Sequence, residues 1–159
     1  MSVYPARRPN RLPYYDYSQV GYYFITICTK HKEQLFGKVV GADVLIGPRV
    51  VLSPYGEAVE TVIVQIPEIE KYVIMPNHVH LIIHLGSSAD GPMGTSAPTH
   101  NISQIVRYLK RAVTTACGET VWQRSFHDHI IRNEADYLRI WSYIDTNPNK
   151  WTEDCYYEV

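Results

Sequence analysis

The order of the predicted elements indicates an α+β fold, a ferredoxin-like (split βαβ, RRM-like) antiparallel sheet with helices on one face. Two observations carry this prediction. Strand-like and helix-like patterns follow one another as strand, helix, strand, strand, helix, strand. A short Pro76-Asn77 turn joins the two middle strands into the hairpin that this topology requires. A further helix follows near the C-terminal end and carries Tyr143.

The composition is that of an ordinary globular protein. A chain of 159 residues with 45% hydrophobic and 19% charged residues predicts one domain, spanning residues 1–159. No apolar run approaches the ~20 residues that a membrane span needs. The first residues contain arginines but no apolar core of a secretory signal. The three cysteines lack metal-ligand spacing, so we expect reduced thiols in a cytoplasmic protein.

Residues 1–17 are rich in Arg, Pro and Tyr and show no period, which predicts an extended basic arm. Its arginines Arg7, Arg8 and Arg11 could follow a nucleic-acid backbone, and a solvated tail is the alternative interpretation. The net charge of the whole chain is only −1, so any surface that binds nucleic acid must be a local one.

The first half of the chain then gives one buried strand, a pair of short strands and a helix. Residues 22–29 are β-branched and aromatic, which predicts a buried strand. Short strands are expected within 35–40 and 43–52. Ser53 has the character of an N-cap and is followed by Pro54, so a helix should begin there and end before Pro67.

The second half contains the hairpin, a loop, two helices and a last strand. The hairpin strands are expected at 69–75 and 78–85, and residues 86–101, dense in Gly, Ser, Pro and Thr, predict a flexible loop. A helical period returns from residue 102 to about 116. Residues 122–132 should form a loop that leads into a strand, and 134–147 the last helix, ended by Pro148.

Two histidines at the head of the second hairpin strand form the first candidate site. His78 and His80 are two residues apart, so on a strand they point the same way, roughly 6.6 Å apart. Two imidazoles so placed can hold one metal ion and leave coordination positions open for catalysis. A satisfied strand histidine is the plainer interpretation. His127 and His129 form a rival pair, and His84 is a further candidate on the same face.

The last helix carries the second candidate site. Its apolar stripe is formed by Tyr137, Ile140, Trp141 and Ile144. Tyr143 lies off this stripe, on a polar face, and Asn147 is its neighbour one turn later. A tyrosine so placed can act as a nucleophile if a cation or metal lowers its pKa from about 10. An amphipathic surface tyrosine is the alternative.

Several segments resemble, in order along the chain, a known family of transposases. MPNHVHLIIH resembles the HUH metal motif of single-tyrosine transposases, where U is the apolar residue between two histidines. YIDTNP, with Tyr143 and Asn147, resembles the nucleophile helix of that family. YDYSQVGYYFITICT, IVRYLKRAVT and WQRSFHDHIIR resemble the branch called REP-associated tyrosine transposases. The loop 86–101 and His127, which stands where the family has an aromatic residue, depart from the pattern.

The resemblance implies that the protein cleaves and rejoins single-stranded DNA at palindromic repeats that fold into hairpins. Tyr143 would attack the scissile phosphate and leave a 5′-phosphotyrosine and a free 3′-hydroxyl. His78, His80 and Asn147 would hold a divalent metal, Mg²⁺ or Mn²⁺, which would polarise that phosphate.

The resemblance also implies partners and a location. We expect single-stranded or hairpin DNA as the partner, a possible homodimer, no membrane, and a cytoplasmic, nucleoid-associated location. The candidates for phosphate contacts are Arg7, Arg8, Arg11, Arg107, Lys110 and Arg111.

Two other functions stay open at this point. The same fold could serve as a non-catalytic module that binds hairpin DNA or RNA by stacking and charge. Alternatively, His78 and His80 could serve a small metal-dependent hydrolase in which water is the nucleophile. Tyr143 would be dispensable in both of these alternatives.

Overall fold

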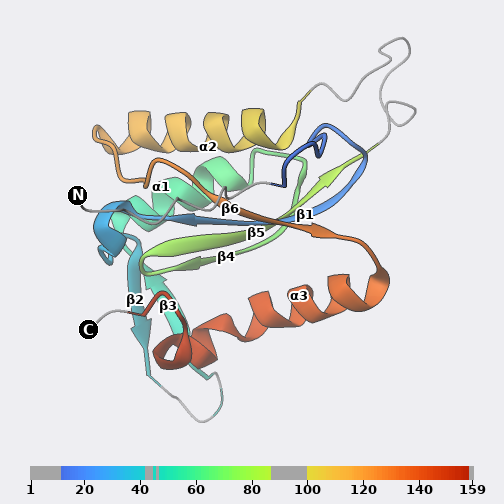
Figure 1. The fold of residues 1–159 in the computed structure, drawn as a ribbon. Coiled ribbons are helices and arrows are strands. Elements are labelled where there is room, and N and C mark those ends of the chain that lie inside the picture. The colour runs from blue at the N-terminus through green and yellow to red at the C-terminus, as the bar shows by residue number, and fades with distance from the viewer. Residues whose placement is uncertain (1–11, 42–44, 46, 87–99, 158–159) are drawn as a thin grey trace, which may run out of the picture.

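Four antiparallel strands form the central sheet of this computed structural model, which describes residues 12–41, 45, 47–86 and 100–157 (Figure 1). The strand order across the sheet is β4-β5-β1-β6. The bounds are β1 Gly21–Cys28, β4 Ile69–Met75, β5 His78–Leu85 and β6 His127–Ile131. The hairpin strands β4 and β5 are adjacent, and the first and last strands of the sheet pair with each other. This arrangement confirms the predicted α+β, ferredoxin-like fold.

Helices cover both faces of the sheet. Figure 1 shows α1 (Pro54–Ile63) and α2 (Ile102–Cys117) on one face and α3 (Glu134–Thr146) on the other. A short 3₁₀ helix, η3 (Asn147–Glu153), follows α3 directly. The predicted arrangement, with two helices on one face and an added C-terminal helix that carries the tyrosine, is therefore confirmed.

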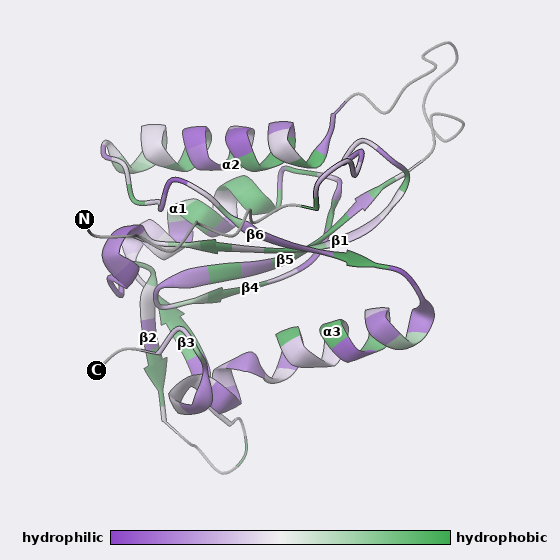
Figure 2. Cartoon of the chain, viewed as in Figure 1, coloured by the Kyte–Doolittle hydropathy of each residue, from purple (hydrophilic) through white to green (hydrophobic). Residues whose placement is uncertain are grey.

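The helices begin and end where the local sequence predicts. The Ser53 side chain accepts a hydrogen bond from the Gly56 N–H and caps α1. Asn101 and Gln104 form a reciprocal capping box at the start of α2. Gly118 ends α2 in the left-handed conformation, with a φ of 74°. Figure 2 shows the apolar residues of α2 turned toward the sheet and the polar ones turned away from it.

Strand β5 lies between two other strands and contributes to both faces. Its odd-numbered residues, such as Val79 and Leu81, join the large core under α1 and α2. Its even-numbered residues include His78, His80 and Ile82, and Ile82 packs in the smaller cluster under α3. Because successive strand residues alternate in direction, one strand supplies both the core and the two histidines.

The remaining strands form a separate two-stranded sheet. β2 (Gly37–Val40) pairs with β3 (Arg49–Leu52) in antiparallel register. The strand expected within 43–52 is therefore shorter than predicted in the part of the segment that the structure describes. Residues 42–44 and 46 lie outside the described residues.

Two further expectations fall largely on residues that the structure does not describe. Arg7, Arg8 and Arg11 lie outside the described residues, as does most of the loop 86–101. The last residues of the predicted arm fold onto the sheet, since Tyr15 and Tyr17 pack against Tyr23. Among the described helices, none is both long and apolar enough to cross a bilayer.

Candidate metal and tyrosine site

His78 and His80 converge at the start of β5, on the face that α3 covers. Their Nε2 atoms lie 3.0 Å apart. Both side chains are almost completely buried, with exposed fractions of 0% and 1%. Two cis ligands with metal–nitrogen bonds of about 2.1 Å would place their nitrogens at about this separation. The spacing of the two histidines in the sequence therefore produces the convergence expected of a metal-binding pair.

Neighbouring side chains orient both imidazole rings. The Nδ1 atom of His78 lies 2.8 Å from Asn77 Oδ1, and the Asn77 amide nitrogen already donates to two backbone carbonyls. Asn77 Oδ1 therefore accepts a hydrogen bond from the His78 Nδ1–H. The Nδ1 atom of His80 lies 2.8 Å from the Thr26 hydroxyl, which can accept in the same way. Hydrogen bonds at Nδ1 leave the Nε2 lone pairs facing each other, as in metal-ligating histidines.

Burial keeps the two imidazoles neutral. It lowers the pKa of His78 to about 4, although the nearby carboxylate of Asp154 acts in the opposite direction. Burial also lowers the pKa of His80 well below its ordinary value, and the proximity of His78 adds to this shift. Neutral imidazole is the form that binds metals, so both rings are ready to act as ligands.

Asp154 completes a group of three potential metal ligands, and sequence reasoning missed it. Its Oδ2 lies 3.7 Å from His78 Nε2, and one ligand atom each of Asp154, His78 and His80 lie within 4.8 Å of one another. Its Oδ1 accepts a hydrogen bond from the Tyr156 N–H, whereas Oδ2 is buried without a partner among the described residues. No local pattern marks this residue, because η3 and the following turn bring it back to β5.

Tyr143 projects from α3 into the same site. Its hydroxyl lies 3.4 Å from His80 Nε2, and its ring packs edge-on against Phe24 and His80. The side chain is 36% exposed, so the phenol is accessible from solvent. Burial raises its pKa, the charge of Asp154 raises it further, and a hydrogen bond from Asn147 lowers it. The tyrosine and the histidine pair of a single chain thus meet without a second copy.

Asn147 lies at the end of α3, one turn after Tyr143. The residue is 2% exposed, and its Oδ1 is buried without a hydrogen-bond partner among the described residues. An unpaired buried amide oxygen costs free energy unless a ligand satisfies it. A carbonyl oxygen is also a donor that Mg²⁺ and Mn²⁺ accept.

The donor set therefore suits a divalent cation. It combines two imidazole nitrogens that face each other with the Oδ2 of Asp154, which is buried without a partner among the described residues. Unsatisfied buried oxygens are rare in folded proteins, and a metal ion is one kind of ligand that would satisfy this one.

The rival histidines lie apart from this group. His129 is exposed and pairs with Asp136, with 2.7 Å between Nε2 and Oδ2. His84 stacks on Tyr22, with ring centroids 4.2 Å apart. Within the described part of the chain, the cluster of His78, His80 and Asp154 is the one group of three or more His, Cys, Asp or Glu side chains with metal-ligand spacing.

The predicted phosphate contacts on α2 lie on the opposite side of the sheet. Arg107 and Arg111 are exposed there. The amino group of Lys110 is half-buried and donates to the Gln123 carbonyl at 2.7 Å and to the Ser125 carbonyl at 3.1 Å. The structure thus separates these three cations from Tyr143 and the histidines.

Comparisons with known proteins find similar sequences and a similar fold, although no family model matches the chain. An uncharacterized protein of Haemophilus influenzae is 38% identical over 95% of this chain and 93% of its own length. The REP-associated tyrosine transposase of Escherichia coli K12 is 36% identical over 52% of this chain and 45% of that protein. A solved structure of a REP-associated tyrosine transposase bound to a REP hairpin superposes with a TM-score of 0.56. It has 28% sequence identity and covers 88% of this chain and 74% of that one.

Two of these matches, to the Haemophilus influenzae protein and to the hairpin-bound structure, extend over most of the chain, and the match to the Escherichia coli transposase extends over about half of it. The predicted resemblance is confirmed: the chain is similar to REP-associated tyrosine transposases in sequence and in fold.

Proposed function

We propose that this protein is a metal-dependent nickase and strand transferase that acts on single-stranded DNA beside a hairpin, through a 5′-phosphotyrosine on Tyr143. The observation that carries the proposal is the position of the Tyr143 hydroxyl, 3.4 Å from His80 Nε2 in a histidine pair whose Nε2 atoms lie 3.0 Å apart. A nucleophile beside a histidine pair that can hold a metal with open coordination positions suits metal-assisted phosphoryl transfer.

The chemical step is a transesterification at phosphorus. The Tyr143 oxygen forms a bond to the scissile phosphorus while the bond from phosphorus to the 3′-oxygen breaks. The phenol loses its proton to solvent, and the departing 3′-oxygen gains one. The number of phosphoester bonds does not change, so a 3′-hydroxyl can attack the phosphotyrosine and rejoin a strand without ATP.

The residues around Tyr143 assist this step in different ways. The hydrogen bond from Asn147 favours the phenolate and opposes the effect of burial on the pKa of Tyr143. Thr26 and Asn77 hold the imidazoles of His80 and His78 in the orientation that ligands need.

His78 and His80, with Asn147 and Asp154 as oxygen donors, would hold a divalent metal, Mg²⁺ or Mn²⁺. When bound, the metal supplies Lewis-acid activation of the phosphate and charge stabilisation for the leaving oxygen. Asp154 is our addition to the ligand set that the sequence suggested.

A hairpin-forming DNA is the proposed substrate class, since the related solved structure holds a REP hairpin. Arg7, Arg8, Arg11, Arg107, Lys110 and Arg111 remain proposed phosphate contacts, and a homodimer remains a possible assembly. A cytoplasmic, nucleoid-associated location follows from the proposed substrate.

A denaturing gel tests the proposal. The protein is incubated with Mn²⁺ and a pool of hairpin oligonucleotides that carry randomised single-stranded flanks and a label at the 3′ end. A 5′-phosphotyrosine leaves the labelled 3′ portion on the protein, so we expect a labelled band that survives boiling in detergent. The band should be absent with EDTA and absent for Tyr143→Phe, while hairpin binding in a native gel persists.

Two other tyrosines serve as matched controls. Tyr137 lies on the same helix and donates to Glu70, and the Tyr156 ring lies 4.6 Å from the His78 ring. Tyr137→Phe and Tyr156→Phe should both retain the covalent band. An undiminished band for Tyr143→Phe would refute the assigned nucleophile. Binding of the pool without any covalent band in the unaltered protein would instead favour a non-catalytic binding module.

A further inference from the structure

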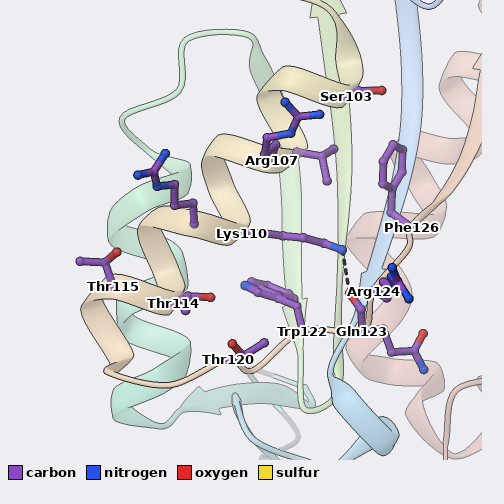
Figure 3. Close-up of a pocket in the computed structure, with 12 residues that line it drawn as sticks. Ser103, Arg107, Lys110, Thr114, Thr115, Thr120, Trp122, Gln123, Arg124 and Phe126 are labelled. Atoms are coloured by element: carbon purple, nitrogen blue, oxygen red, sulfur yellow. Dashed lines mark hydrogen bonds between the residues drawn. The ribbon is translucent and has the colours of Figure 1, made fainter.

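A second cleft of about 620 Å³ lies on the opposite face of the sheet from Tyr143, between α2 and the segment that leads into β6 (Figure 3). Four cationic side chains line it, and no acidic side chain is among the described residues that line it. The cationic residues are Arg107, Lys110, Arg111 and Arg124. Four hydroxyl side chains add further hydrogen-bond donors, those of Ser103, Thr114, Thr115 and Thr120. This lining is complementary to an anion that carries several acceptor oxygens.

The arginines of the cleft are not neutralised by any acidic side chain that the structure describes. Among the described residues, Arg107, Arg111 and Arg124 have no acidic partner, and all three are exposed. The acidic residue that follows α2, Glu119, is engaged by Tyr55 and Lys30 instead. Arginine without an internal partner is the residue type that most often binds phosphate bidentately.

Trp122 supplies an independent sign of a ligand. Its side chain is 5% exposed and packs on Phe36, with ring centroids 5.0 Å apart. Its Nε1–H is buried and has no hydrogen-bond partner among the described residues. In Figure 3 the indole lies across the cleft between Lys110 and Thr120. A buried indole N–H normally has an acceptor, so this N–H is available to an acceptor that enters the cleft.

The buried position of the indole also decides which part of a nucleic acid fits. An indole that is only 5% exposed offers no open face on which a base could stack, so base stacking does not explain Trp122. An N–H donor beside arginines and hydroxyls suits a phosphate oxygen.

Lys110 holds the 122–126 segment against α2 through the carbonyls of Gln123 and Ser125, which keeps the cleft formed. Burial lowers the pKa of Lys110 to about 8, so its amino group is still mostly charged at neutral pH.

The cleft lies at the same end of the sheet as the histidine pair. Trp122 bridges to Thr29, the Gln123 N–H donates to the Cys28 carbonyl at 2.9 Å, and Cys28 pairs with His78. Only two strand spacings, about 10 Å in total, separate the 122–123 segment from β5 across the sheet. A DNA strand can therefore pass around the β6 edge from one face to the other.

We infer that this cleft is a phosphate-binding site for the backbone of the DNA on which the protein acts, with Trp122 Nε1–H, Arg107, Arg111 and Arg124 as donors. The inference rests on the proposed function for the identity of the DNA and names where its flanking backbone is held. Two sources of backbone share this chemistry, the single-stranded flank and the hairpin stem.

Fluorescence anisotropy in EDTA tests the inference separately from catalysis, because no covalent step takes place without metal. The probes are a fluorescein-labelled oligothymidylate and a labelled hairpin without flanks. Non-specific backbone binding is independent of sequence, so no particular repeat is needed. We expect Arg107→Gln to raise Kd roughly tenfold and to reduce the salt slope by about 0.7–0.9 between about 50 and about 200 mM salt. Arg49→Gln, an exposed arginine on β3, is the charge-matched control and should bind as the unaltered protein does.

Trp122→Phe removes the N–H donor and keeps an aromatic ring against Phe36. We expect weaker binding with unchanged circular dichroism. The indole N–H signal that Trp122→Phe deletes from the ¹⁵N spectrum should shift when the unaltered protein is titrated with DNA. A larger loss with oligothymidylate assigns the cleft to the flank, and a larger loss with the hairpin assigns it to the stem. Equal affinity of Arg107→Gln and Arg49→Gln for both probes, or an unmoved Trp122 signal, would overturn the inference, whatever the covalent assay shows.

Discussion

The two faces of the four-stranded sheet differ in what their side chains do. The face under α1 and α2 buries a large apolar cluster, which includes Val79, Leu81 and Leu109. The face under α3 buries a much smaller one, centred on Ile82 and Ile140, and next to it holds the histidine pair and Tyr143. Because side chains alternate along β5, one set of them packs the core while the other set is free to carry polar groups.

A truncation in the large core should have the largest effect on stability. Leu109 is completely buried on α2. Leu109→Ala should lower the free energy of unfolding by about 3 kcal/mol, because the substitution leaves a cavity. For a chain of this size that corresponds to a Tm lower by roughly 6–12 °C. Differential scanning fluorimetry measures the shift, with Leu138→Ala on the exposed side of α3 as the control. A Tm shift for Leu109→Ala no larger than that for Leu138→Ala would contradict the view that the face under α1 and α2 carries most of the stability.

Removal of a histidine should act on metal binding, with a smaller effect on stability. A ligand that binds only the folded state at about one hundred times its Kd adds about 2.7 kcal/mol. Excess Mn²⁺ should therefore raise the Tm of the unaltered protein by roughly 5–10 °C, and EDTA should reverse the rise. His80→Ala should abolish this rise, while Leu109→Ala should keep it. A full Mn²⁺ response in His80→Ala would place the metal elsewhere.

Asp154→Asn should stabilise the metal-free protein and weaken its binding of Mn²⁺. Asp154 Oδ2 is buried without a partner, beside neutral imidazoles. Removing that charge should stabilise the metal-free protein by about 1 kcal/mol, since an unpaired buried charge is costly. The same change should weaken Mn²⁺ affinity at least several-fold. Calorimetric titration and thermal unfolding in EDTA measure the two effects, and a loss of stability in EDTA would show that the carboxylate has a structural role instead.

Substitution of the rival histidine His129 should have the smallest effect on metal affinity and on stability. His129 and Asp136 form an exposed pair that also involves Arg139, and exposed pairs contribute about 0–1 kcal/mol. His129→Ala should leave Mn²⁺ affinity unchanged within twofold and shift the Tm only slightly. The titration that measures His80→Ala checks this directly. A tenfold loss of affinity in His129→Ala would reverse the assignment of the metal pair.

The helices, the strands and the local geometry of the two motifs can be predicted from the sequence. Periods of two and of 3.6 residues place His78 with His80 on one face of a strand, and Tyr143 with Asn147 on one face of a helix. The capping residues Ser53 and Asn101 likewise mark helix starts from their neighbours alone. These features are local, so a one-dimensional pattern is enough to predict them.

Which of these motifs come into contact depends on the tertiary structure. Local periodicity tells which face a side chain takes but not which element will cover that face. The contact of Tyr143 with His80, the return of Asp154 to His78 and the unpartnered indole of Trp122 all depend on long-range packing. Asp154 carried no local signal because η3 and a turn, rather than a repeating pattern, bring it to the site. Sequence patterns therefore predict the helices, the strands and the two motifs. The packing of α3 and the C-terminal turn against β5 brings the residues of the site together.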